Sequence, residues 1–311
     1  VTLRPRPRNP LTTSLKLLSR SGPKPTPRTM QLLRRYDLAG AWGANPQKAL
    51  LGLHEVQSVE PTASHEYALA ELAYVGGKKA ELLRREEALN LFGASTMHAY
   101  RYLFDPQFGM ARNPYDPQFR QACNLYNSAL EDALRIVRKH HSLRPGETYT
   151  CETESQPLDV TVELRARGWH NEDIERFEFV SDYRVQGLGN HHETYGLGVP
   201  MIAVRKRHTA EDPVEQYYPP NLSFPVTAFL RMLPPAGGDH PPGRNRAILE
   251  LYDPLVTTHV QVVNRTIPLQ TDLSTPLAYF LNQPAFNDSR LSTFGFLYPD
   301  RAQSRGLRGM Y

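Results

Sequence analysis

The sequence lacks the features that mark membrane-spanning, disulfide-rich and metal-binding proteins. Its two cysteines, Cys123 and Cys151, match no metal or redox spacing. It has no run of about eighteen apolar residues, the length at which a segment becomes a candidate membrane-spanning helix. With 40% hydrophobic and 22% charged residues in 311, the composition is that of a folded globular chain with room for two domains.

The signatures of common active sites are also missing. The nucleophile motif Gly-x-Ser-x-Gly does not occur, and residues 93–97 lack its closing glycine. Neither histidine pair, at 140–141 or 191–192, has a spacing suited to chelating one ion. Residues 187–192 place histidine where the dinucleotide-binding motif needs its third glycine, and they lead into a strand instead of a helix. We therefore predict no catalytic, cofactor-binding or metal-binding residue.

Acidic residues are absent from the chain before Asp37, whereas basic residues are frequent there. Residues 1–28 alternate proline with basic and hydroxyl residues, a composition typical of an extended, solvated tether. Contact with nucleic acid or an anionic membrane is the alternative, because a basic arm can neutralise phosphates. No aromatic residues are interleaved with the charges, so we predict no specific nucleic-acid partner. The basic residues before Asp37 are Arg4, Arg6, Arg8, Lys16, Arg20, Lys24, Arg28, Arg34 and Arg35.

Helical periodicity dominates residues 29–144, which we predict to form a subdomain of antiparallel helical hairpins. Thr29 is the predicted N-cap of the first helix, and Asn45 precedes the second. Gly76-Gly77 is predicted to break a helix, and a second interruption is expected near Gly93. The predicted helices span 30–36, 46–56, 65–75, 78–104 and 117–141.

From residue 145 the pattern changes to short β-branched or aromatic runs separated by turn residues. We predict an α+β protein in which residues 145–281 form an antiparallel β-sandwich-like domain or a half-open barrel. A loop is expected at 234–245, a helix at 275–281 with Asp272 or Ser274 as its cap, and a linker at 282–311. The predicted strands are 148–151, 158–164, 176–179, 183–188, 199–205, 223–232, 247–252 and 257–263.

Reactive side chains and flexible backbone come together in residues 181–205. The candidate functional residues are His191, His192 and Glu193, in a loop between two strands. One interpretation is a structural turn that hydrogen-bonds its own loop. The alternatives are a pH-sensitive or substrate-edge contact, or a metal-dependent site that uses both histidines.

Five segments together resemble a known family. Their order is similar to that in the amino-terminal half of large bacterial α/β-hydrolase proteins, which are predicted serine esterases or lipases. They are Tyr126-Asn127 with Ala129-Leu130; Asp182-Tyr183 with 187–188 and 196–200; residues 224–230; residues 249–254; and residues 271–279.

This resemblance implies an accessory region without triad residues. The partner would be a hydrolase domain of the same polypeptide after Tyr311, and residues 306–311 are similar to the join before it. Envelope location as a lipoprotein or secreted protein, with peripheral association, is also implied. The alternative is a non-catalytic binding module for a protein or cell-envelope ligand. Exposed rings among Tyr195, Tyr217 and Tyr218 would favour that alternative.

Overall fold

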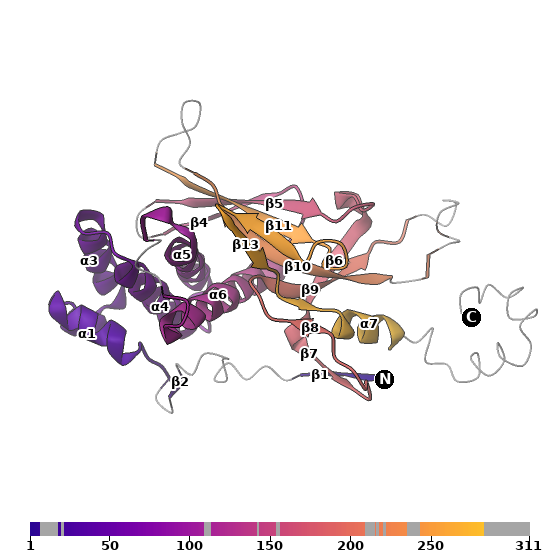
Figure 1. Cartoon of the computed structure of the whole chain (residues 1–311), viewed down its shortest axis with the longest axis horizontal. Coiled ribbons are helices and arrows are strands. Elements are labelled where there is room, and N and C mark those ends of the chain that lie inside the picture. Colours follow the sequence, from indigo (N-terminus) through magenta and orange to yellow (C-terminus); the bar gives the residue numbers. More distant parts are fainter. Residues whose placement is uncertain are drawn as a thin grey trace, which may run out of the picture.

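The computed structural model describes residues 1–6, 18–19, 22–108, 113–141, 143–153, 156–208, 215, 218–219, 222–234 and 243–282. The helices of residues 27–141 gather at one end of the molecule, and a curled sheet, with a short helix at 274–281 beside it, forms the other end (Figure 1). The predicted α+β class is therefore confirmed. Tyr217, most of the predicted 234–245 loop, most of the 282–311 linker and part of the 1–28 tether lie outside the described residues.

Six α-helices make up the described part of the amino-terminal half. The first one, α1, begins one turn earlier than predicted, because Thr26 is the N-cap and its Oγ1 accepts a hydrogen bond from the Thr29 N–H at 3.4 Å. Asn45 caps α3 as predicted, through the Lys48 N–H. The helices are α1 (Pro27–Arg35), α2 (Ala39–Ala44), α3 (Pro46–Val59), α4 (Ala63–Ala80), α5 (Arg85–Phe104) and α6 (Pro117–His141), with a 3₁₀ turn at Pro106–Phe108.

The helix breaks predicted at Gly76-Gly77 and near Gly93 were wrong. Helix α4 continues through both glycines, and α5 continues through Gly93. A Cβ atom on Gly77 would lie 2.6 Å from Cε1 of Phe92, and one on Gly93 would lie 3.1 Å from Cβ of Cys151. Because these glycines have no side chain, α5 can approach α4 and strand 148–151 of the sheet closely. This packing offsets the low helix propensity of glycine.

The main sheet has six strands in the order β4-β5-β11-β10-β9-β6. Strands β5 and β11 pair in parallel along their whole length, so the sheet is mixed and the purely antiparallel prediction was wrong at this pair. Three strands have the predicted bounds: β4 (Thr148–Cys151), β9 (Val199–Arg205) and β10 (Ser223–Met232). The others are β5 (Leu158–Arg165), β6 (Ile174–Phe179) and β11 (Asn245–Tyr252).

Small two-stranded ribbons lie outside the main sheet. Residues Thr2–Pro5, predicted as part of the tether, form β1 and pair with β7 (Tyr183–Gln186). The predicted 257–263 strand is β12 (His259–Val262), which pairs with β13 (Arg265–Pro268). Strands β8 (Glu193–Thr194) and β14 (Thr271–Asp272) pair just before helix α7 (Ser274–Leu281), and β2 (Leu18–Ser19) pairs with β3 (Gly22–Pro23).

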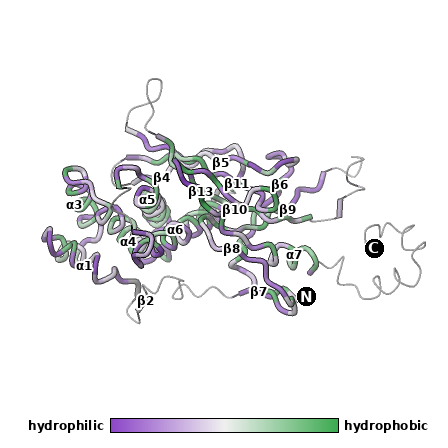
Figure 2. Tube along the Cα trace, viewed as in Figure 1, coloured by the Kyte–Doolittle hydropathy of each residue, from purple (hydrophilic) through white to green (hydrophobic). Residues whose placement is uncertain are grey.

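One apolar core runs between the helices and the sheet. Hydrophobic residues gather along the central strands, next to the helices (Figure 2). Leu130 and Leu134 of α6 belong to the same buried cluster as Leu158 of β5 and Leu249 of β11. This cluster crosses the boundary predicted at 144–145, so the two predicted subdomains share their main packing surface. None of the described helices combines the length and apolar character needed to cross a membrane.

The hydroxyl of Tyr126 joins α6 to the sheet. Strand β9 begins at Val199 opposite Ala228, so it no longer flanks β10 at Leu230. Tyr126 takes the place of a strand there: its hydroxyl donates to the Leu230 carbonyl at 2.7 Å and accepts from the Leu230 N–H at 2.8 Å. Burial raises the pKa of Tyr126 well above its ordinary value, which keeps the hydroxyl protonated.

We expect Tyr126→Phe to lower the free energy of unfolding by about 2–4 kcal/mol, because it leaves a buried N–H and a buried carbonyl without partners. Chemical denaturation of both proteins measures the change. Tyr115→Phe is the matched control, since Tyr115 is 94% exposed and should shift the midpoint negligibly. Equal stability of the Tyr126→Phe and Tyr115→Phe proteins would contradict this role.

A buried carboxyl group lies between α4 and the start of α1. Glu71 is 0% exposed, its Oε2 accepts from Thr26 Oγ1 at 3.0 Å, and its Oε1 has no hydrogen-bond partner among the described residues. Burial raises the pKa of Glu71 above 4.5, against the lowering effect of hydrogen bonds from Thr29 and Thr26. Folding therefore shifts the equilibrium of Glu71 toward its protonated form.

This raised pKa gives a pH dependence with a defined sign. The contribution of Glu71 to stability is complete below its unfolded pKa of 4.5 and is lost as the pH rises through its folded value. Glu71→Gln should therefore gain stability relative to the native chain between pH 4.5 and 7.5, in thermal unfolding at both pH values. A stability difference that stays constant over this range would show that Glu71 does not titrate as described.

Candidate functional site

The three predicted site residues lie together at the surface, beside helix α7. His191, His192 and Glu193 are all exposed, and Glu193 begins β8. The backbone of His192 is fixed: its N–H donates to Ser274 Oγ at 2.7 Å, and its carbonyl accepts from the Leu273 N–H at 2.9 Å. The loop is thus held by the start of α7 and not by hydrogen bonds within itself, which corrects the self-bonded turn interpretation.

Within the described ranges, no group of three or more His, Cys, Asp or Glu side chains is placed to hold a metal ion. The other histidine pair, at 140–141, ends α6, and its side chains lie outside the described residues. The ring nitrogens of His191 and His192 make no hydrogen bond to the part of the chain that the structure describes. The loop therefore offers two solvent-facing imidazoles on a fixed backbone.

Asn127, next to Tyr126 on α6, holds the second half of this loop. Its Nδ2 donates to the Gly196 carbonyl at 3.0 Å and to Gln270 Oε1 at 2.6 Å, and its Oδ1 accepts from the Gly198 N–H at 2.8 Å. Gln270 in turn donates its N–H to the Leu197 carbonyl at 2.9 Å, and its own carbonyl accepts from Thr227 Oγ1 at 2.9 Å. One amide side chain therefore connects α6, the loop before β9 and the segment before β14.

Two glycines of the loop are needed for this close approach. A Cβ atom on Gly196 would lie 2.2 Å from the Pro268 carbonyl oxygen, where no shift of a flexible side chain could make room. Gly198 has φ +110°, and its Cβ would lie 2.8 Å from the Ala228 carbonyl oxygen. The two glycines therefore allow a tight return of the backbone into β9.

Asp272 and Ser274, the two residues predicted as candidate caps of α7, have different roles at the start of this helix. Asp272 is buried, and its Oδ1 accepts from the Ser274 and Thr275 N–H groups at 2.8 Å each, while its Oδ2 accepts from Thr275 Oγ1 at 2.6 Å. Leu273 occupies the N-cap position of α7, and the side chain of Asp272, one residue earlier, satisfies the first two N–H groups of the helix. Ser274 is left free to anchor His192.

These elements enclose a groove of about 650 Å³. Its walls are the 188–192 loop, the start of β10 and one face of α7, together with Leu255. Leu255 and Leu277 are 64% and 50% exposed, so the rim is apolar. Polar groups are few: Asn190, His192, Ser274 and Ser223, whose Oγ is buried without a hydrogen-bond partner among the described residues.

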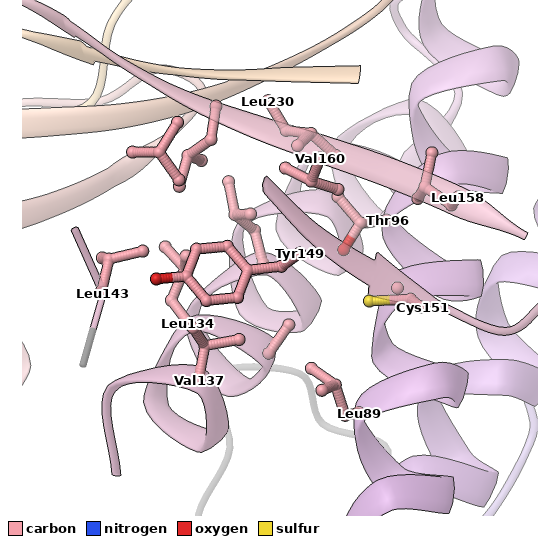
Figure 3. Close-up of a pocket in the computed structure, with 15 residues that line it drawn as sticks. Leu89, Thr96, Leu134, Val137, Leu143, Tyr149, Cys151, Leu158, Val160 and Leu230 are labelled. Carbon is pink, nitrogen blue, oxygen red and sulfur yellow. The ribbon is translucent and has the colours of Figure 1, made fainter. Parts of the chain in front are cut away.

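A second, smaller cavity of about 50 Å³ lies between α5, α6 and the sheet (Figure 3). Its lining is almost entirely apolar, with the Cys151 sulfur and the Tyr149 ring pointing into the same region. Burial raises the pKa of the Cys151 thiol to about 11, and that of Cys123 also to about 11. Both cysteines are therefore neutral thiols near pH 7, and this cavity is a packing defect without reactive groups.

The sequence analysis did not single out Asn127 or Gln270 as site residues. Asn127 follows the buried residue Tyr126 on α6. An amide side chain next to a buried helix face is the sequence feature that could have indicated its role.

Comparisons of the chain with models of protein families, with curated proteins and with solved structures found no match.

Substitution of the loop glycines tests whether the loop before β9 is packed against Pro268 as described. Gly196→Ala should destabilise the protein by about 2 kcal/mol or more, because the backbone must move away from Pro268. Gly189→Ala is the matched control: nothing lies within 4 Å of its Cβ position, so its effect should stay within about 0.5 kcal/mol. Urea denaturation measures both, and a neutral Gly196→Ala would show that the loop is not packed as described.

Proposed function

We propose that this chain is the accessory, non-catalytic region of a serine ester hydrolase, and that its groove is the surface on which the hydrolase domain docks. The link to ester hydrolysis rests on the motif order of residues 126–130, 182–200, 224–230, 249–254 and 271–279. The docking role rests on the groove and on its position relative to α7. Antiparallel hairpins of α4, α5 and α6 and a sandwich-like arrangement of the sheet and its ribbons would form the scaffold.

The observation that carries the proposal is the apolar rim of the groove. Exposed Leu255 and Leu277 line the hollow together with Phe280. Contiguous exposed apolar surface of this kind typically marks an interaction site. Ser274, one of the few polar groups of the groove, is occupied in holding His192, and this supports a binding role over a chemical one.

The position of α7 supports docking of the polypeptide that follows it. Helix α7 ends at Leu281, one residue after Phe280 of the groove lining. The polypeptide that follows Asn282 therefore leaves from the groove. A domain joined covalently through it has a raised effective concentration at this surface, so modest contacts are enough for docking.

A second candidate is a binding module for a protein or cell-envelope ligand, without a hydrolase partner. The observation that favours it is Tyr195, which is 84% exposed at the end of β8. The Tyr218 ring makes contacts within the chain: the Arg205 guanidinium lies 4.4 Å from its centroid, and the centroid of the Trp169 ring lies 6.1 Å from it. An exposed aromatic ring is a common anchor in protein recognition.

Hydrolysis of 4-nitrophenyl butyrate distinguishes these candidates. We expect no turnover by the 311-residue chain and turnover by a version extended beyond Tyr311. Comparable turnover by the shorter chain would place catalysis within it. No turnover by the extended version would favour the binding module.

Docking itself is tested in the extended version. Leu277→Asp should lower the unfolding free energy of the hydrolase domain by about 1–2 kcal/mol, because it places a charge in an apolar contact. Leu83→Asp is the matched control, since Leu83 is also exposed but lies in the helical half. Equal effects of the two substitutions would remove the groove from the proposal.

A further inference from the structure

The ribbon of β1 and β7 stands apart from the main sheet and beside α7 (Figure 1). The strands are antiparallel, with Leu3 opposite Val185 and Arg4 opposite Arg184. The Arg6 N–H extends the ladder to the Asp182 carbonyl at 2.7 Å. Backbone hydrogen bonds therefore account for most of the contact between the two strands.

Both strands of this ribbon lie beside α7, but their side chains are held differently. Strand β7 is anchored: the Tyr183 ring packs edge-on against Tyr279 of α7 at 5.4 Å, and Asp182 just before it pairs with Arg135 of α6 at 2.7 Å. Strand β1 has only Leu3 partly buried, and its other side chains are exposed. Since an isolated two-stranded ribbon is marginally stable in water, β1 is the weak member.

The cross-strand pairs make β1 an imperfect partner for β7. Arg4 and Arg184 are both exposed and directly opposite each other, and like charges in this position are destabilising. An acidic side chain in place of Arg4 would turn this repulsion into an attraction. The edge of β7 thus offers backbone hydrogen bonds, an apolar contact at Val185 and, at Arg184, a positive charge that pairs with no acidic side chain among the described residues.

We propose that the β7 edge is a docking site for an extended polypeptide segment of a partner protein, with an apolar residue opposite Val185 and an acidic residue opposite Arg184. Strand β1 is a built-in, weakly held occupant that such a segment displaces. This is recognition by strand addition, in which backbone bonds give affinity and alternate side chains give specificity. The site is separate from the groove and does not depend on the proposed hydrolase partner.

The probe is a labelled peptide with the sequence of residues 1–6 carrying Arg4→Glu, and the reference is the same peptide unaltered. The receptor is the full chain with Leu3→Asp, which weakens the intramolecular competitor. NMR titration should show shifts of the β7 amides, with the Arg4→Glu peptide binding about three- to tenfold more tightly than the reference. Arg184→Glu in the receptor should reverse this preference.

A disulfide provides the matched control. Leu3→Cys with Val185→Cys joins directly opposite residues of β1 and β7, so oxidation locks β1 in place. The oxidised chain should lose peptide binding at β7, and reduction should restore it. Equal binding by the oxidised and reduced chains, an unchanged preference in the Arg184→Glu receptor, or no shift of the β7 amides would each overturn the proposal.

Discussion

The interaction on which the rest depends is the docking of two adjacent α6 side chains onto the sheet. Buried backbone groups need partners, and β10 loses its neighbour where β9 begins. The Tyr126 hydroxyl satisfies both backbone groups of Leu230, and the Asn127 amide satisfies groups on Gly196 and Gly198. Because these two residues are consecutive, the position of α6 fixes the end of β10 and the start of β9 together.

The candidate site follows from this constraint. Asn127 also bonds Gln270, which leads into β14, and β14 pairs with β8 immediately after the two histidines. The Asp272 side chain then satisfies the first two N–H groups of α7, and Ser274 holds His192. The groove walls are therefore connected by hydrogen bonds to the middle of α6, so the surface is preformed. A preformed apolar groove with a fixed rim suits docking, because little ordering entropy is lost on binding.

Much of the fold was predictable because local patterns agreed with it. The bounds of β4, β9, β10 and α6 follow from period-two and three-to-four spacing. The parallel pairing of β5 and β11 was not predictable, since the strands are far apart in sequence and no local signal sets their direction. The helix breaks predicted at Gly77 and near Gly93 were wrong because glycine is typical both of a helix break and of a close contact between helices. His191 and His192 lie in a surface loop as predicted, whereas Glu193 begins strand β8. Asn127 was missed because its partners are all distant in sequence.

Amide hydrogen exchange in an Asn127→Ala protein tests the central claim most directly. If Asn127 holds the groove, the amides of Leu197, Gly198, Gln270 and Leu273 should lose protection by about tenfold or more, corresponding to a lost buried hydrogen bond. The amides of the β10–β11 pair should keep theirs, because Tyr126 still caps Leu230. Unchanged protection at Gly198 and Gln270 would contradict the account.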